Sequence, residues 1–217
     1  MTARDIVLGR IRAALADVPD DETPADVPVP RDYLRSHAGA DVVGLFAERV
    51  ADYRARVVRT SAADAPAAIA RMLGEQRIAD LVVPPGFPEE LLPEGPWNRL
   101  DDQEPLSVAE LDAAGGVLST AAAAIAVTGT IVLDAGPGQG RRVLTLLPDY
   151  HLCVVRADQI VGDVPEALAL LDPARPLTFV SGPSATSDIE LDRVEGVHGP
   201  RTLDVLVVDR DQPQEVG

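Results

Sequence analysis

The spacing of hydrophobic residues near the N-terminus predicts a helix followed by a linker. Four apolar residues recur there at the spacing of one helix face: Val7, Ile11, Ala14 and Leu15. Because Thr2 precedes them as a suitable N-cap, we expect a helix over 2–16. Residues 17–30 are rich in Pro and acidic residues, which favours an extended linker. The pattern therefore predicts an arm over 1–30 and a separate domain over 31–212.

Helical and strand-like patterns alternate along the rest of the chain. Helices are predicted over 41–55, 63–76, 88–92 and 165–171. A further helix is expected to begin at Ser107, which forms a capping-box pattern with Glu110, and to end at Gly115-Gly116. Strands are predicted over 56–60, 79–83, 122–127, 130–133, 152–156, 177–180 and 203–208. This order predicts an α/β sandwich whose ligand lies beyond the carboxyl ends of the strands.

Residues 113–133 contain no charged side chain and are about as long as a membrane-spanning helix. Gly115-Gly116 and Thr128-Gly129-Thr130 interrupt this stretch, and its end is rich in β-branched residues. We therefore expect two adjacent buried strands here and no transmembrane helix.

The charge of the chain excludes several classes of function. Among 217 residues the net charge is -16, and all 19 basic residues are Arg. Nucleic acid binding needs clustered basic residues, which this sequence lacks. Without Lys there can be no Schiff-base lysine, pyridoxal phosphate attachment or P-loop of the GK[ST] type. Any anion site is expected to use Arg, backbone N–H groups or a helix N-terminus.

Cys153 is the only cysteine of the chain. One thiol cannot form an intrachain disulfide, an iron–sulfur cluster or a Cys-rich zinc site by itself. The residue lies in an alternating apolar run, which favours a buried strand thiol over a nucleophile. The N-terminus lacks the uninterrupted apolar segment of a secretory signal, so a cytoplasmic location is predicted.

Two polar, turn-rich blocks are the candidate functional site. The first block, 128–142, supplies these candidate ligand-binding residues: Thr128, Gly129, Thr130, Gly136, Gly138, Gln139, Gly140, Arg141 and Arg142. The second block, 181–201, supplies a further set: Ser181, Gly182, Ser184, Thr186, Ser187, Asp188 and His198. Each block follows a predicted strand, so the two loops would share one crevice if those strands are neighbours.

The chemistry of the first block has two interpretations. Its glycines permit N–H groups to converge on an anion, with arginines adding charge. Alternatively, the block is a structural turn whose arginines pair with carboxylates. A dinucleotide fingerprint is not favoured, because Arg141 occupies the place of the last glycine.

The second block also has two interpretations. Its N–H groups could face an anion, and the weak catalytic candidates are Asp188, Glu190 and His198. The alternative is a helix cap with surface charges, because no spacing supports a catalytic triad. His37 and His151 are expected to be structural or solvated, since neither has metal-ligand spacing.

The strings TGTIVLDAGPGQGRRVLTLLPDYHLCVV and SGPSATSDIELDRVEGVHGPRTLDVLVV closely resemble the LUD domain of the lactate utilization protein C family. The resemblance spans roughly residues 115–210. It implies a three-layer α/β sandwich similar to the NagB, RpiA and CoA-transferase folds. It also implies a role in a three-component system that oxidises L-lactate to pyruvate, in which sister proteins carry the iron–sulfur clusters and this chain binds no cofactor alone.

This chain departs from the family at Val127, where related sequences usually have Glu, and this weakens the expectation of independent catalysis. The leading hypothesis is a subunit of a lactate-oxidising complex that binds a small carboxylate or phosphate-bearing anion and docks on iron–sulfur proteins. A second hypothesis is a free-standing enzyme acting on a nucleotide, CoA or folate-like substrate, although ATP use is disfavoured without Lys. A third is a non-catalytic assembly or regulatory module.

Overall fold

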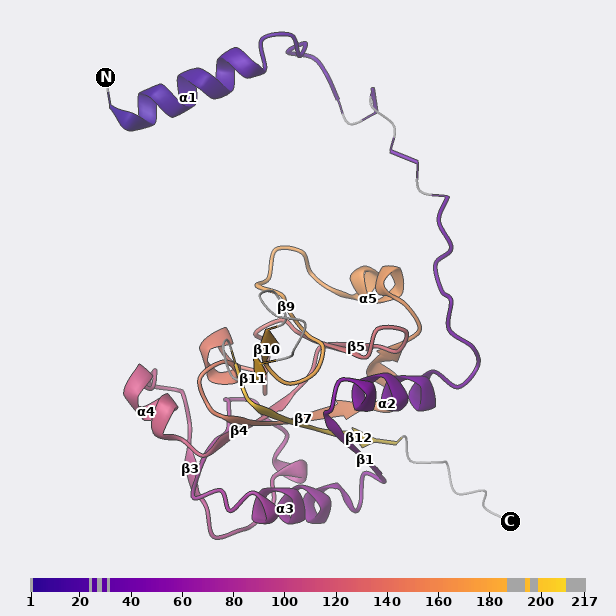
Figure 1. Cartoon of the computed structure of the whole chain (residues 1–217), viewed down its shortest axis with the longest axis vertical. Helices are drawn as coiled ribbons and strands as arrows, with labels where there is room; N and C mark the ends of the chain where they lie inside the picture. Colours follow the sequence, from indigo (N-terminus) through magenta and orange to yellow (C-terminus); the bar gives the residue numbers. More distant parts are fainter. Residues whose placement is uncertain are drawn as a thin grey trace. The chain divides into compact units, whose positions relative to one another are not determined.

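A computed structural model describes residues 2–23, 25–26, 29–30, 32–186, 194–195 and 199–209, with the backbone alone at 185–186 and 194–195. The chain divides into two compact units, Met1–Leu34 and Arg35–Gly217 (Figure 1). The first unit contains helix α1 (Ala3–Ala14), which begins with a capping box between Thr2 and Asp5 and has no buried residue. The helix predicted over 2–16 is confirmed.

The second unit is built on a parallel sheet of six strands. The order across this sheet is β1 (Arg56–Thr60), β12 (Thr202–Val208), β7 (Tyr150–Arg156), β4 (Gly116–Thr120), β2 (Asp80–Val82) and β3 (Asn98–Leu100). Every neighbouring pair runs parallel. The α/β class predicted from the sequence is confirmed.

A smaller sheet of four strands packs beside the first. Its order is β8 (Ile160–Val161), β5 (Ala123–Ile125), β6 (Thr130–Leu133) and β9 (Thr178–Val180). Here β6 is antiparallel to both β5 and β9, whereas β8 runs parallel to β5. Strands β10 (Ala185–Thr186) and β11 (Val194–Glu195) form a separate antiparallel pair.

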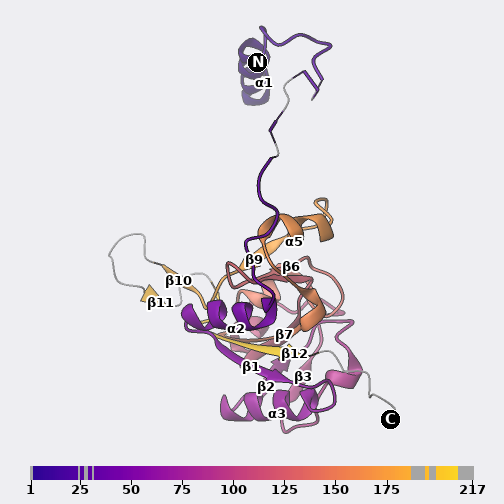
Figure 2. The ribbon, with the colours of Figure 1, turned by 90° about the vertical axis from the view of Figure 1, so that its right-hand side faces the viewer.

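Helices cover both faces of the six-stranded sheet (Figure 2). On one face, α3 (Ala65–Glu75) packs its apolar side against residues such as Leu152 and Leu206. On the other face, α2 (Val42–Asp52) and strands β5 and β6 enclose a second core that includes Val155. Since both faces are buried, the inner strands β7 and β12 are buried at nearly every position and mostly apolar, whereas the edge strands β1 and β3 are partly exposed.

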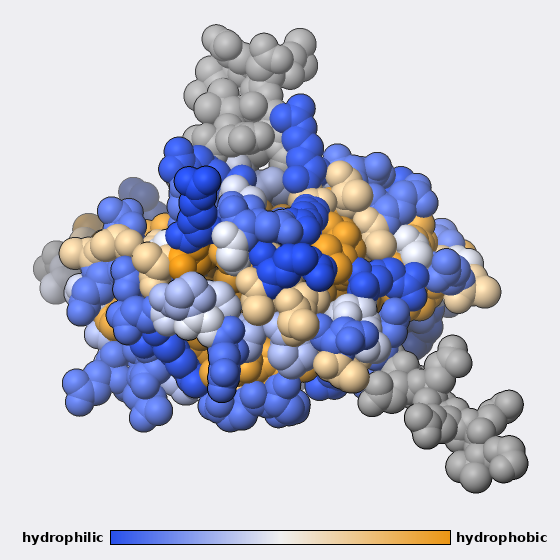
Figure 3. All heavy atoms as spheres, turned by 90° about the horizontal axis from the view of Figure 1, so that it is seen from below, coloured by the Kyte–Doolittle hydropathy of each residue, from blue (hydrophilic) through white to orange (hydrophobic). Residues whose placement is uncertain are grey.

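Shorter helices complete the second unit. They are α4 (Val108–Ala113), α5 (Val164–Leu170) and the 3₁₀ turns η1 (Glu89–Leu91), η2 (Arg142–Thr145) and η3 (Ala157–Gln159). Helix α4 begins at the predicted capping box of Ser107 and Glu110. Helix α5 packs Ala167 on the smaller sheet. On the face near α3, hydrophilic side chains predominate and hydrophobic atoms lie between them (Figure 3).

The uncharged stretch 113–133 forms three strands, β4, β5 and β6, and not the two that were expected. The difference arises because α4 ends at Ala113 and β4 begins at Gly116, with only two residues between them. Within the described ranges, no helix is long and apolar enough to cross a membrane.

Candidate functional site

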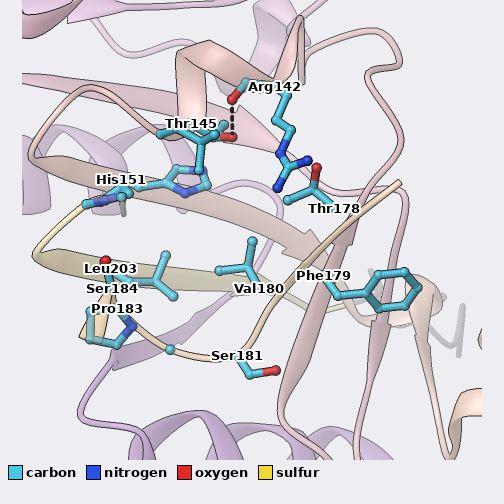
Figure 4. A pocket seen from close by; sticks show the side chains of 14 residues that line it. Arg142, Thr145, His151, Thr178, Phe179, Val180, Ser181, Pro183, Ser184 and Leu203 are labelled. Atoms are coloured by element: carbon cyan, nitrogen blue, oxygen red, sulfur yellow. Dashed lines mark hydrogen bonds between the residues drawn. The ribbon is translucent and has the colours of Figure 1, made fainter. Parts of the chain in front are cut away.

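A cavity of about 290 Å³ lies where the two sheets and η2 meet. Its polar lining side chains are Arg142, Thr145, His151, Thr178, Ser181 and Ser184 (Figure 4). Gly199, Pro200 and Leu203 border it at the start of β12, and Gly182 borders it after β9. Both sequence blocks therefore contribute to one cavity, the first of them through Arg142.

The position of the cavity differs from the expected one. His151 and Leu203, which are register partners, are the second residues of β7 and β12, so the cavity lies at the amino ends of these two parallel strands. The prediction of a site beyond the carboxyl ends holds for β9 alone. The reason is that β6 and β9 belong to the smaller sheet and pair antiparallel, with Ile131 opposite Val180.

This antiparallel pairing separates the glycine-rich loop from the second block. The loop leaves the Leu133 end of β6, whereas Ser181 follows β9 at the opposite end of the pair. At that opposite end the blocks meet through hydroxyl groups: Thr130 Oγ1 lies 2.8 Å from Ser181 Oγ and 2.7 Å from Thr128 Oγ1. Gly129 turns between the two threonines with φ +58°.

The glycine-rich loop has the geometry of a structural turn. The Gly136 N–H donates to Asp134 Oδ1 at 3.0 Å, and the Gly138 N–H donates to the Pro85 carbonyl at 2.8 Å. The amides of Gln139 and Gly140 both donate to the Gly136 carbonyl. The buried Gln139 side chain in turn accepts from the Asp134 N–H at 2.6 Å. Convergence of these amides on an anion is therefore not what the structure shows.

Arg141 also has a structural role. Its guanidinium donates to both carboxylate oxygens of Asp102, at 2.7 and 2.8 Å, and to the Leu106 carbonyl at 2.6 Å. The hydrogen bonds from Arg141 hold the pKa of Asp102 below its ordinary value. This is the carboxylate pairing that the alternative interpretation of the first block predicts.

Arg142 remains as the cation of the cavity. It opens η2, and its side chain points across the cavity toward Thr178 (Figure 4). None of the ion pairs between described residues includes Arg142; nearby carboxylates such as Asp134 are paired with other arginines, here Arg175. An exposed guanidinium beside hydroxyl groups is suited to a small anion.

The second block is described only in part. Gly182 has φ +85° and packs against Tyr53, while the Ser184 N–H donates to the Pro200 carbonyl at 2.8 Å. The backbone of Thr186 lies in β10. The remaining candidates fall outside the described residues: Ser187, Asp188, Glu190 and His198.

The sequence did not single out His151, Thr145 or Thr178 as site residues. His151 is only 1% exposed, and its Nε2 lies 2.7 Å from the buried hydroxyl of Ser119. Burial lowers the pKa of His151 to about 4, so its imidazole is neutral at neutral pH. The expected structural role is consistent with this burial, but the alternation along β7 gave no sign that the ring lines a cavity.

The other flagged residues lie elsewhere. Cys153 is completely buried, and burial raises the pKa of its thiol to about 12, as expected for a strand thiol. His37 Nδ1 lies 2.5 Å from Asp163 Oδ2, and its side chain is 63% exposed. Across the described ranges, no three His, Cys, Asp or Glu residues are grouped so that they could hold a metal ion.

Comparisons with known proteins agree on one family. The model of the LUD domain matches residues 107–208. A protein of Deinococcus radiodurans named "Lactate utilization protein C" is 48% identical over 91% of this chain and 91% of its own length. A protein of the same name from Shouchella clausii is 32% identical over 52% of this chain and 51% of its own.

A solved structure shares the fold. It is the crystal structure of a DUF162 family protein from Deinococcus radiodurans, with a TM-score of 0.66 and 43% identity, covering 81% of this chain and 99% of that chain. Together with the full-length similarity above, this shows that the chain belongs to the lactate utilization protein C family, which is characterised by the LUD domain.

Proposed function

We propose that this chain is a cytoplasmic subunit of an L-lactate utilization system and binds a small carboxylate in the cavity beside Arg142. The similarity to a protein named for lactate utilization, over 91% of both chains, supports the role in that process. The placement of Arg142 in the cavity supports the ligand class.

The Arg142 guanidinium is the observation that carries the ligand assignment. A planar guanidinium matches the two oxygens of a carboxylate, and Thr178 lies beside it, whereas the Thr145 hydroxyl donates to the Arg142 carbonyl at 3.2 Å (Figure 4). The cavity is open on one side, and its volume of about 290 Å³ lies near the lower end of the range for ligand sites. A three-carbon acid fits within this volume.

Oxidation of lactate to pyruvate releases two electrons and two protons, which need acceptors. A chain with one cysteine does not hold an iron–sulfur cluster by itself. We therefore place the clusters in partner proteins, to which this chain docks and which receive the electrons.

The carboxylate site is tested by calorimetric titration with L-lactate and pyruvate. Replacing Arg142 by Gln removes a charge-assisted hydrogen bond, so we expect affinity to fall about 10- to 100-fold. Arg71→Gln, on the exposed side of α3, is the matched control and should bind as the wild type does. Equal binding by the Arg142→Gln variant would remove the support for this site.

The role in the complex is tested by co-expression with the iron–sulfur proteins of a lactate utilization system. We expect co-purification and lactate-dependent reduction of the clusters, followed by electron paramagnetic resonance. The Arg142→Gln complex should assemble but be reduced more slowly. Absence of both the complex and the reduction would contradict the proposed function.

A further inference from the structure

His151 and Ser119 form a buried polar pair at the wall of the cavity. Ser119 lies on β4 and His151 on the neighbouring strand β7, and they are 0% and 1% exposed. The Ser119 hydroxyl lies 2.7 Å from Nε2 of the imidazole. This contact fixes the ring beside a cavity that Arg142 also lines.

The pair leaves one ring nitrogen for another partner. No described residue is hydrogen-bonded to Nδ1 of His151, although the residue lines the cavity. Among the described residues, no fully buried side-chain nitrogen or oxygen lacks a hydrogen-bond partner, so Nδ1 is accessible from the cavity, where a ligand or solvent oxygen can bond to it. Because the ring is neutral, it offers one donor and one acceptor.

We propose that His151, oriented by Ser119, recognises the oxygen on C2 of a 2-hydroxy or 2-oxo acid whose carboxylate is paired with Arg142. This inference rests on the proposed function and adds the group that distinguishes lactate from a plain carboxylic acid. In Figure 4 the His151 ring lies next to Thr145 and the Arg142 guanidinium lies next to Thr178, and both residues line the cavity.

The chemistry of the pair suits both the alcohol and the ketone. If Ser119 accepts from Nε2–H, then Nδ1 can accept a hydrogen bond from a 2-hydroxyl group. If the Ser119 hydroxyl instead donates to Nε2, then Nδ1–H can donate to a 2-oxo group. Since a hydroxyl group can donate or accept, one site can hold L-lactate and pyruvate alike.

The test compares calorimetric affinities for L-lactate, pyruvate and propionate, which has a carboxylate but no oxygen on C2. For the wild type we expect L-lactate and pyruvate to bind about 10-fold tighter than propionate, the effect of one hydrogen bond. In His151→Leu this preference should disappear while the affinity for propionate stays unchanged. In Ser119→Ala, which keeps the imidazole but not its support, the preference should shrink.

Val155→Ala is the matched control, because Val155 is buried on the same face of β7 but does not line the cavity. Its preference should equal that of the wild type even if its stability falls. If the His151→Leu variant does not fold, the affinities of the Ser119→Ala variant test the proposal: an unchanged preference for lactate over propionate would contradict it.

Two failures are distinguishable. If the wild type binds lactate and propionate equally, and both depend on Arg142, the inference about His151 is wrong and the carboxylate site stands. If none of the three acids binds, the proposed ligand of the cavity is wrong, and the inference about His151 is then wrong as well.

Discussion

Arg141 and Arg142 are adjacent in sequence but act on different parts of the molecule. Arg141 precedes η2 in extended conformation and pairs with Asp102, whereas Arg142 is the first residue of η2 and faces the cavity. The double arginine is therefore not a doubled anion site. One guanidinium fixes the loop, and the other is available for a ligand.

The Asp102–Arg141 pair should contribute measurably to stability. The Asp102 side chain is only 6% exposed and accepts two hydrogen bonds from Arg141 and one from the Leu106 N–H. Asp102→Asn should lower the free energy of unfolding by about 1–2 kcal/mol, as measured by urea denaturation. Asp52→Asn, which breaks an exposed pair with Arg49, should cost less than about 0.5 kcal/mol.

The pH dependence of this pair follows from the lowered pKa of Asp102. A carboxylate with a lowered pKa stabilises the fold above its unfolded pKa, and that contribution is lost as pH falls through the folded value. The difference between wild type and Asp102→Asn should therefore be constant above about pH 5 and shrink below about pH 4. A difference that persists unchanged at pH 2–3 would contradict this cause.

The residues of the site could be predicted where they lie in polar, turn-rich stretches of the sequence. Arg142, Ser181 and Ser184 lie in polar blocks that a core would not tolerate, and they do line the cavity. His151 and Thr178 belong to strands whose alternation is explained by the sheet alone. Which side of such a strand faces a cavity depends on packing between residues far apart in the sequence. The pattern of apolar and polar residues within the strand does not reveal it.

At the scale of elements, the residue that caps helix α5 also contacts a distant segment of the chain. Asp163 is the N-cap of α5 and forms a capping box with Glu166. Its carboxylate also accepts from the His37 N–H at 3.2 Å and lies 2.5 Å from His37 Nδ1. The cap of α5 therefore also anchors the segment that leads into α2.

Replacing this cap should cost more than replacing a cap with local contacts alone. Asp163→Ala should lower the free energy of unfolding by about 2 kcal/mol, and Ser107→Ala at α4 by about 1 kcal/mol. His37→Ala should account for part of the difference, because it keeps the cap but removes the ring contact. Equal losses for Asp163→Ala and Ser107→Ala in chemical denaturation would show that the contact with His37 contributes nothing.

Most helices and strands could be predicted from the periodicity of apolar residues, but the pairing of the strands could not. The helix over 65–75 and the strand over 150–156 have clear spacing and lie close to their predicted bounds. Strand β4 was not predicted because its five residues begin at the Gly115-Gly116 pair that was expected to end a helix. The antiparallel direction of β6 and β9 could not be predicted, since a run of alternating residues has no intrinsic direction.

At the scale of the whole molecule, the two units should differ in their importance for folding. Unit 2 contains the buried hydrophobic clusters, whereas α1 has no buried residue. Deletion of residues 1–34 should therefore leave the melting temperature of unit 2 within about 2 °C of the full chain. Circular dichroism during heating measures this.

A longer deletion provides the control. Removing residues 1–40 also removes His37 and its bond to Asp163, so this variant should melt several degrees lower, by roughly 3 °C for each kcal/mol lost. If the shorter deletion destabilises the protein as much as the longer one, the first unit contributes to the folded core after all.

The place of β12 in the six-stranded sheet determines when the chain can finish folding. β1 is an edge strand whose neighbour is β12, and β12 separates it from β7. During synthesis β1 leaves the ribosome long before residues 202–208 exist, so until then β1 and the facing edge of β7 have no partner strand. Sheets that join distant segments form slowly and expose unpaired strand edges meanwhile. A chain truncated before β12 would therefore leave the edges of β1 and β7 unpaired and be prone to aggregate.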